Sequence, residues 1–269
     1  MKVCDDSETG AMAVVAPSAG GGAATASVRV FAINLRRSTE RWARLEPQLR
    51  KLGLPWERFE AVDGQTAALT APLGGYDPGL NRRQFHRPLS KGEMACYESH
   101  LGALRRFLAT RAEYALVLED DVLLLPELGD AVAAALRSAE PWDVVKLGSV
   151  SPKAVRRERR LGRFRWRQYW KAPISGFAHL VSRAGAARLL TARHRYGRPF
   201  DVDLQYWWEA GLRIRGIEPY PVIPWDKSVS EIRGRGGRPP RHAWYSSIVA
   251  RLRFQILNWK HSRRPEVDC

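Results

Sequence analysis

The sequence predicts an α/β fold with a mostly parallel sheet flanked by helices, and two observations lead to this class. Short apolar segments rich in β-branched residues alternate along the chain with longer segments of helical periodicity. Apolar residues make up 45% of the 269 residues, and ten residues are Trp, which is enough for a substantial core. Such alternation is typical of a sheet whose faces are covered by helices.

Five short apolar runs are the expected strands. The first is "VRVFAINL" (28–35), and the second, "WERFEAVDG" (56–64), ends at a turn formed by Asp63 and Gly64. The others are expected at 114–118, 142–149 and 176–182, and extended chain is expected at 213–223.

The segments between these strands carry helical patterns. Residues 37–54 keep apolar residues at helical spacing and stop at Gly53, although Pro47 should kink or break this helix. The next helix opens with Ser90 and Glu93, which have the spacing of a capping box. Shorter helices are expected at 127–138, 183–192 and 201–211, and a loop is expected at 65–89.

Both ends of the chain differ from this central part, which we place at 28–240. Residues 1–27 are rich in Ala, Gly and Ser and carry acids where a signal peptide carries positive charge, so we expect a flexible leader. Residues 241–269 form a basic amphipathic segment, expected to be helical, that either lies on an anionic membrane or packs as an ordinary core helix. Its apolar stripe consists of Trp244, Ile248, Leu252, Ile256 and Trp259.

The chain is strongly basic, with a net charge of +16 from 44 Lys and Arg against 28 Asp and Glu. This surplus favours an anionic partner, the alternative being a solvated basic surface. In the hairpin-like segment 151–171, nine Lys or Arg alternate with aromatic residues that can stack on bases or lie beside phosphates. The three cysteines, Cys4, Cys96 and Cys269, are scattered, which fits a reducing compartment.

Three adjacent carboxylates, Glu119, Asp120 and Asp121, follow the apolar strand at 114–118. Such charges repel one another at the edge of a core unless a cation or hydrogen-bond donors meet them. In one interpretation, one Asp caps the following turn and the other carboxylates are solvated. In the other, the triplet holds Mn²⁺ or Mg²⁺, which prefers oxygen ligands and often binds the phosphates of a substrate.

In an open α/β sheet, ligands bind beyond the carboxyl ends of the strands. The expected strands place four positions at one such rim: Asn34, Asp63, the triplet 119–121 and Gly148. We therefore expect the ligand to be held by the loops at this rim.

Four segments, in this order, resemble glycosyltransferase family 25, the lipopolysaccharide-biosynthesis galactosyltransferase group. They are "FAINLRRSTERW", "FEAVDG", "LSKGEMACYESHLGAL" and "YALVLEDDV". Later segments such as "VVKLGS" and "PFDVDLQ" extend the resemblance to about residues 28–233. The resemblance implies a GT-A-type (Rossmann-like) fold, a UDP-sugar donor, usually UDP-galactose, a divalent metal, and inversion at the anomeric carbon.

The resemblance also implies roles for single residues. Asp121 would be the best direct ligand of the metal, and Glu119 would reach the ribose or a water on the metal. The expected nucleotide-binding set consists of Asn34, Arg36, Arg41, Asp63, His100, Glu119 and Asp120. For His100 the alternative is a buried histidine with a purely structural part.

An inverting transfer needs a general base that removes the proton of the acceptor hydroxyl. A carboxylate can do this, and Asp203, Asp201 and Glu231 are the candidates, in this order of preference. Alternatively, Asp201 or Asp203 only caps the helix that follows it.

These expectations describe a hexosyltransferase of lipopolysaccharide or surface-glycan synthesis, with galactose as the expected sugar. Its partners would be a UDP-sugar and an anionic saccharide or glycolipid acceptor, with no nucleic acid. We expect it in the cytoplasm, in peripheral contact with the inner face of the membrane. Competing hypotheses are a transferase with another donor such as UDP-glucose, or a non-catalytic binder of nucleic acid or anionic lipid.

Overall fold

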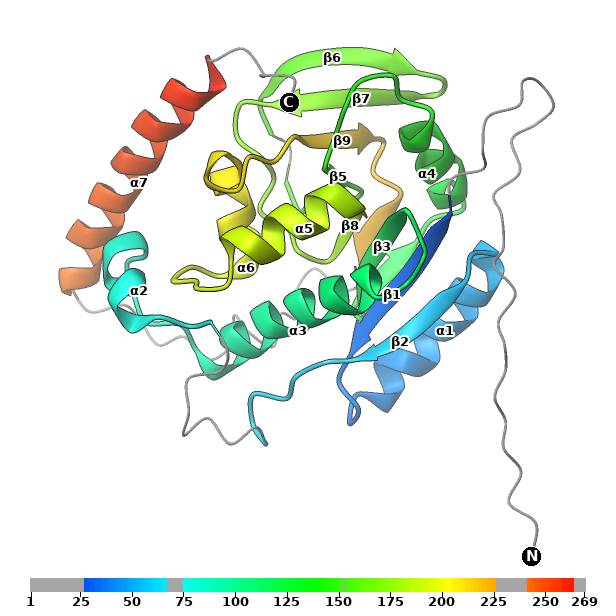
Figure 1. Ribbon diagram of the computed structural model, residues 1–269, viewed down its shortest axis with the longest axis horizontal. Coiled ribbons are helices and arrows are strands. Elements are labelled where there is room, and N and C mark those ends of the chain that lie inside the picture. The colour runs from blue at the N-terminus through cyan, green and yellow to red at the C-terminus, as the bar shows by residue number, and fades with distance from the viewer. Residues whose placement is uncertain (1–26, 67–74, 152, 226–240, 264–269) are drawn as a thin grey trace, which may run out of the picture.

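The computed structural model describes residues 27–66, 75–151, 153–225 and 241–263, with side chains from residue 251 onward in the last segment. Its centre is an eight-stranded sheet in the order β2-β1-β3-β8-β5-β9-β7-β6 (Figure 1). These strands are β1 (Val28–Asn34), β2 (Trp56–Glu60), β3 (Tyr114–Glu119), β5 (Val144–Lys146), β6 (Val155–Leu161), β7 (Phe164–Tyr169), β8 (Ala178–Ser182) and β9 (Ile214–Glu218).

The sheet is mixed, although most of its strands share one direction. β1 pairs in parallel with β2 and β3, and β5 pairs in parallel with β9. β8 is antiparallel to both β3 and β5, and β7 is antiparallel to both β9 and β6. Six strands therefore run one way, and only β8 and β7 run the other, which confirms the α/β class and adds two reversed strands to the predicted sheet.

Helices cover both faces of the sheet, as the apolar pattern of β1 requires. Alternate residues of a strand point to opposite faces, so Val30 joins one core cluster while Phe31 joins the other. The first cluster is covered by α1 (Thr39–Leu52) and α4 (Leu128–Leu136), the second by α3 (Lys91–Leu108), α5 (Arg183–Ala192) and α6 (Phe200–Asp203). Figure 1 shows α3 and α5 side by side on the same side of the sheet.

The local signals for helix ends are confirmed. Ser90 accepts a hydrogen bond from the backbone of Glu93, whose side chain accepts one from the backbone of Ser90, so the capping box is present. α1 ends at Gly53, which has a φ of +69°. Of the two predicted effects of Pro47, a kink or a break, the break is wrong, because α1 runs on through it from Thr39 to Leu52.

Several short elements were not predicted. The expected loop 65–89 contains α2 (Pro78–Gln84), which begins where the Asp77 side chain accepts a hydrogen bond from the backbone of Leu80. A two-stranded sheet pairs β4 (Val122–Leu124) with β10 (Val222–Pro224). The expected helix 201–211 divides into α6 and a 3₁₀ helix, η1 (Leu204–Glu209).

The two basic segments form separate elements at the margin of the molecule. The hairpin-like segment is confirmed as the β6–β7 hairpin, at the sheet end opposite β2. The C-terminal segment forms α7 (Arg241–Ser262), which lies along one side of the molecule in Figure 1. Among the residues described, no helix combines the length and apolarity needed to span a bilayer.

Candidate functional site

The acidic triplet lies in a turn that links the two sheets. Glu119 is the last residue of β3, Asp120 and Asp121 form the turn, and β4 then pairs with β10. The backbone N–H of Trp225 donates to the carbonyl oxygen of Asp121 at 2.8 Å. Because β1, β2 and β5 run in the direction of β3, their carboxyl ends lie at the same rim, as predicted.

Asp120 is fixed by side chains from the first strand and helix. The Asn34 amide donates to one carboxylate oxygen at 2.6 Å, and the Arg41 guanidinium donates to the other at 3.1 Å. The Asn34 carbonyl oxygen in turn accepts hydrogen bonds from Arg58 at 3.0 and 2.5 Å. Burial raises the pKa of Asp120, while Asn34 and Arg41 oppose that rise. Both oxygens of Asp120 are therefore engaged within the protein, and the residue ties the acidic turn to β1.

Asp121 is the open carboxylate of the triplet. Within the described part of the chain, no other side chain donates a hydrogen bond to it, and it is half-buried. Burial, followed by the charges of Glu119 and Asp120, raises the pKa of Asp121 to about 7. A cation at this carboxylate would offset both effects, so the local electrostatics suit a metal ligand.

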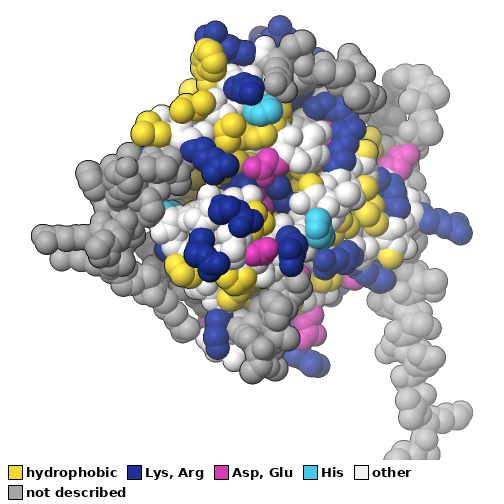
Figure 2. Space-filling view, turned by 60° about the vertical axis from the view of Figure 1, so that its left-hand side comes forward, with side chains coloured by type: hydrophobic (Ala, Val, Ile, Leu, Met, Phe, Trp, Pro, Cys, Tyr) yellow, Lys and Arg dark blue, Asp and Glu magenta, His cyan; other side chains and the backbone are white. Residues whose placement is uncertain are grey.

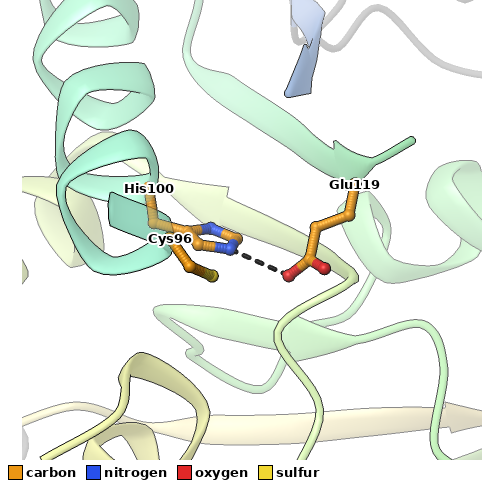
Figure 3. Close-up of side chains that lie close together, drawn as sticks. All are labelled: Cys96, His100 and Glu119. Carbon is orange, nitrogen blue, oxygen red and sulfur yellow. Dashed lines mark hydrogen bonds and ion pairs between the residues drawn. The ribbon is translucent and has the colours of Figure 1, made fainter. Parts of the chain in front are cut away.

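Glu119 is positioned by His100, which comes from α3. His100 Nε2 lies 3.0 Å from Glu119 Oε1, as the dashed line in Figure 3 shows. The His100 ring is buried and stacks on Phe200 at a centroid distance of 4.1 Å. His100 is thus a buried ring held in place by packing, and its Nε2 atom faces Glu119 in the acidic turn.

Gly176, which lies two residues before β8, comes close to the His100–Glu119 pair. A Cβ atom at Gly176 would lie 3.0 Å from Glu119 Oε1 and 3.5 Å from His100 Nε2. A side chain here would crowd the carboxylate that His100 positions. Gly176 thereby keeps space beside Glu119.

Two buried residues at this rim escaped the sequence analysis. The Lys146 Nζ atom donates to the carbonyl oxygen of Ser175 at 2.5 Å, and burial lowers the pKa of Lys146 to about 8. His179 is buried beside His100, and burial holds its pKa well below the ordinary range. A lysine at the end of an apolar strand, as in "VVKLGS", is the sequence signal that could have indicated Lys146.

Asp201 lies close enough to this group to interact with it electrostatically. Burial raises its pKa, the Lys146 charge lowers it, and the Glu119 charge raises it again. One Asp201 oxygen accepts a hydrogen bond from the backbone N–H of Val202 at 2.8 Å. The side chain is half-buried, so Asp201 combines proximity to the triplet with access from solvent.

Asp203 has a different environment, although it was the preferred candidate for the general base. It is only 4% exposed, and the Tyr97 hydroxyl donates to it at 2.5 Å. Arg193 Nε and Arg198 NH1 lie 3.0 and 3.1 Å from its two oxygens. Two guanidinium groups hold the carboxylate, and burial keeps substrate away from it, so this geometry speaks against Asp203 as the base.

Among the described residues, no hydrogen bond or ion pair joins Asp63 or Arg36 to this group. Asp63 forms an ion pair with Arg37 at 2.7 Å, and the hydrogen bond from Arg37 lowers the pKa of Asp63. Arg36 is exposed in the turn after β1. Glu231 lies outside the described residues.

The fold and this rim define an α/β protein whose candidate ligand site is rich in carboxylates. Glycosyltransferase family 25 (LPS biosynthesis protein) matches residues 28–170, which include the acidic turn. A glycosyltransferase 25 family member of Anopheles gambiae is 33% identical over 215 residues, covering 72% of this chain and 35% of that protein. The chain belongs to glycosyltransferase family 25.

The chain is also similar to a procollagen galactosyltransferase and, in structure, to a solved glycosyltransferase. Procollagen galactosyltransferase 1 of Danio rerio is 27% identical over 221 residues, covering 72% of this chain and 36% of that protein. The chain thus spans about a third of the length of these relatives. A crystal structure of a Drosophila β-1,4-galactosyltransferase 7 mutant with manganese, UDP-Gal and xylobiose aligns with a TM-score of 0.43 at 11% identity, covering 79% of this chain and 75% of that one. A TM-score of 0.43 is too low to assign any property of that protein to this chain.

Proposed function

We propose that this chain is a metal-dependent, inverting glycosyltransferase that moves a hexose from a UDP-sugar to a saccharide hydroxyl, on a GT-A-type fold. The observation that carries the proposal is the contrast between Asp120 and Asp121. Asp120 is engaged by Asn34 and Arg41, whereas the neighbouring Asp121 carboxylate has a raised pKa and no side-chain donor among the described residues. Such a carboxylate, at the carboxyl end of a central strand, is suited to a cation that accompanies a diphosphate.

Asp121 and Glu119 are the residues that would hold Mn²⁺ or Mg²⁺. Both ions prefer oxygen ligands, and the carboxylate charges that raise the pKa of Asp121 supply the attraction. When bound, the cation would neutralise the charge that develops on the diphosphate leaving group. His100 holds Glu119 at 3.0 Å and so fixes one side of this ligand set.

Asp201 is the residue that we assign as general base. It would accept the proton of the acceptor hydroxyl while that oxygen attacks the anomeric carbon from the face opposite the diphosphate. Its raised pKa, caused first by burial, makes it a stronger base than an exposed aspartate. Asp203 instead holds α6 in place through Tyr97 and its two arginines.

Galactose is the sugar that we propose for the donor, because a relative over 72% of this chain carries the name procollagen galactosyltransferase. The acceptor that we propose is an anionic saccharide or glycolipid of a lipopolysaccharide or surface glycan. The net charge of +16 supports an anionic acceptor. Another donor, such as UDP-glucose, is the alternative that the first experiment decides.

The test is a UDP-release assay with UDP-galactose, UDP-glucose and UDP-N-acetylglucosamine, with and without Mn²⁺. We expect metal-dependent turnover that is fastest with UDP-galactose. Asp121→Asn should lower this turnover by roughly 100-fold or more, a loss of about 3 kcal/mol of transition-state stabilisation. The matched control is Asp130→Asn, because the Asp130 side chain is 65% exposed and pairs only with Arg163 in the described chain.

Two outcomes would overturn the proposal. Asp121→Asn with undiminished metal-dependent turnover would remove the proposed metal ligand. No turnover with any UDP-sugar, together with tight binding of nucleic acid or anionic lipid, would favour the non-catalytic alternative.

A further inference from the structure

The proposed site for Mn²⁺ or Mg²⁺ at Asp121 and Glu119 is termed the hard-metal site below. A second set of potential ligands lies beside it. Cys96 and His100 stand one turn apart on α3, so both side chains project from the same face of the helix. Together with Glu119 they offer one ligand atom each, and these atoms all lie within 4.8 Å of one another. Figure 3 shows the Cys96 sulfur and the His100 ring directed toward the space next to the Glu119 carboxylate.

The donor atoms of this cluster differ from those at Asp121. A thiolate, an imidazole nitrogen and a carboxylate oxygen are the ligands of Zn²⁺, whereas Mn²⁺ and Mg²⁺ prefer oxygen alone. Zinc binds sulfur at about 2.3 Å and nitrogen at about 2.0 Å, so ligand atoms around one ion lie roughly 3 to 4 Å apart. A contraction of about 1 Å would therefore bring the cluster to that geometry.

We propose that Cys96, His100 and Glu119 form an inhibitory site for Zn²⁺ or a similar thiophilic cation. Three protein ligands leave a fourth position for water or substrate, as in other zinc sites that are not purely structural. Binding removes the thiol proton, which passes to solvent. It also removes Glu119 from the proposed hard-metal site, so that the two cations compete for one carboxylate.

The surroundings explain why the sulfur stays a thiol until a cation arrives. Burial raises the pKa of Cys96 well above its ordinary value, and the charges of Glu119 and Asp201 raise it further. The same two carboxylates attract a divalent cation. Because the raised pKa keeps Cys96 protonated, its reactivity as a free thiolate is low.

The binding test uses the full chain and Co²⁺ as a spectroscopic stand-in for Zn²⁺, because cobalt bound to a thiolate gives a charge-transfer absorption band. We expect one equivalent of cobalt to produce this band in the wild type and zinc to abolish it. Cys96→Ser should lose the band and weaken zinc binding by about tenfold or more. The matched control changes the other two cysteines, Cys4→Ser and Cys269→Ser together, and should keep both properties.

The inhibition part rests on the proposed glycosyltransferase activity, but the binding part does not. We expect micromolar zinc to inhibit the Mn²⁺-dependent turnover of the wild type and of the control, and to spare Cys96→Ser. Equal zinc affinity in Cys96→Ser and the wild type would overturn the site. Loss of binding with unchanged inhibition would overturn the inhibitory role, and absence of all turnover would count against the proposed function while the cobalt band still decides the site.

An independent observation concerns how α7 packs. Its inward side is held by Phe254, which is 6% exposed and lies edge-on to the Tyr206 ring at 5.0 Å. The His261 ring stacks on Trp208 at 5.2 Å. The side chain of Asn258 donates to the backbone carbonyl of Trp170 at 2.6 Å. These contacts fix which side of the helix faces the body of the protein.

Three residues of the predicted apolar stripe face the opposite way, whereas the side chains of Trp244 and Ile248 lie outside the described part of the chain. Leu252, Ile256 and Trp259 are 53%, 65% and 56% exposed, and their spacing places them on one face. Figure 2 shows hydrophobic and basic side chains together on the flank that carries α7. The prediction of an ordinary core helix is therefore wrong for these three residues, and α7 carries apolar side chains on two faces.

We propose that the outer face of α7, formed by Leu252, Ile256 and Trp259, binds the headgroup region of an anionic bilayer. A contiguous exposed apolar face marks an interaction surface. The cations beside it are Arg251, Lys260 and Arg263, all exposed, and the Arg263 guanidinium lies 4.3 Å from the Trp259 ring. Apolar side chains ringed by cations match lipid tails below anionic headgroups, whereas a nucleic acid would require only the cations.

The test is co-sedimentation with vesicles of phosphatidylcholine, with and without phosphatidylglycerol. We expect binding only to the anionic vesicles, and a loss of tenfold or more in the variant Leu252→Ser, Ile256→Ser, Trp259→Ser. The control variant is Val150→Ser, Ile223→Ser, Trp225→Ser, because these apolar residues are also exposed, at 57%, 37% and 48%. It should bind like the wild type.

Three results would contradict this surface. The α7 variant could bind anionic vesicles as well as the wild type, or neutral vesicles could serve as well as anionic ones. Alternatively, light scattering could detect a dimer that the α7 substitutions dissociate, which would make a second copy of the chain the occupant.

Discussion

At the scale of single residues, three neighbouring acids differ because their surroundings differ. Asp120 receives donors from Asn34 and Arg41, and Glu119 meets His100, whereas Asp121 is affected first by burial and then by the repulsion of the other two carboxylates. Chemically similar side chains thereby take different parts in one turn. A titration and a stability measurement can separate them.

The first prediction concerns pH. Burial and neighbouring carboxylates raise the pKa of Asp121 to about 7 in the metal-free protein, and a metal binds only the ionised form. Affinity for Mn²⁺ should therefore fall as the pH drops below 7, by about tenfold per pH unit well below the pKa. Isothermal titration at several pH values checks this, and affinity that is flat from pH 8 to 5 would contradict it.

The second prediction follows from the same shift. Because folding raises this pKa above its unfolded value, the ionised carboxylate destabilises the metal-free protein, and this penalty grows as the pH rises from about 4 to above 7. Asp121→Asn should raise the melting temperature at pH 8 and lose that advantage near pH 4. Thermal unfolding at both pH values measures it, and Asp130→Asn should show no such dependence.

The third prediction separates Asp203 from Asp201. Removing the Asp203 charge leaves the buried Arg193 and Arg198 with Glu209 as their remaining carboxylate partner. Asp203→Asn should therefore cost about 2 to 3 kcal/mol of unfolding free energy. Asp201→Asn should lower turnover by roughly 100-fold with far less effect on urea unfolding. Normal stability and lost turnover in Asp203→Asn would restore Asp203 as the base.

At the scale of elements, the reversed strand β8 brings a glycine to the site. β8 pairs antiparallel with β3. The residues just before β8, including Gly176, therefore lie where β3 ends at Glu119. A strand that runs the other way thus contributes its amino end to a rim otherwise built from carboxyl ends. A Cβ atom at Gly176 would lie 3.0 Å from Glu119 Oε1, so an alanine there would require the carboxylate to shift by a few tenths of an ångström.

The fourth prediction tests this approach. Gly176→Ala should push Glu119 from His100, because the new Cβ would lie 3.0 Å from Glu119 Oε1, and turnover should fall by about tenfold or more. The control is Gly129→Ala in α4, where an added Cβ meets nothing within 4 Å. That change should leave turnover intact and stabilise the protein by about 0.5 to 1 kcal/mol in chemical unfolding. Equal turnover in both variants would contradict the role of Gly176.

At the scale of the whole molecule, the two basic segments lie at the margin of the fold. The β6–β7 hairpin forms the sheet end opposite β2, and α7 lies along one side (Figure 1). The charged margin and the carboxylate site are spatially distinct parts of the protein.

The fifth prediction concerns salt. If the basic surface holds an anionic acceptor, raising the ionic strength from about 0.1 to 1 M shortens the screening length from about 10 to 3 Å and should raise the KM for that acceptor several-fold. A neutral saccharide acceptor serves as the control, and its KM should barely change. An equal response of both acceptors would contradict this role of the charge.

The sequence by itself determined the α/β class, the carboxyl end of α1, the amino end of α3 and the place of the acidic turn. These follow from apolar periodicity, Gly53 and the Ser90 capping box, which act between residues close together in the chain. The tertiary structure alone decided which carboxylate is open, because the donors that occupy Asp120 lie 86 and 79 positions away. The partner that binds Asp203 through Tyr97 lies 106 positions away, and the outward turn of the α7 stripe depends on the burial of Phe254. Such long-range contacts leave no local pattern, so they appear only when the chain has folded.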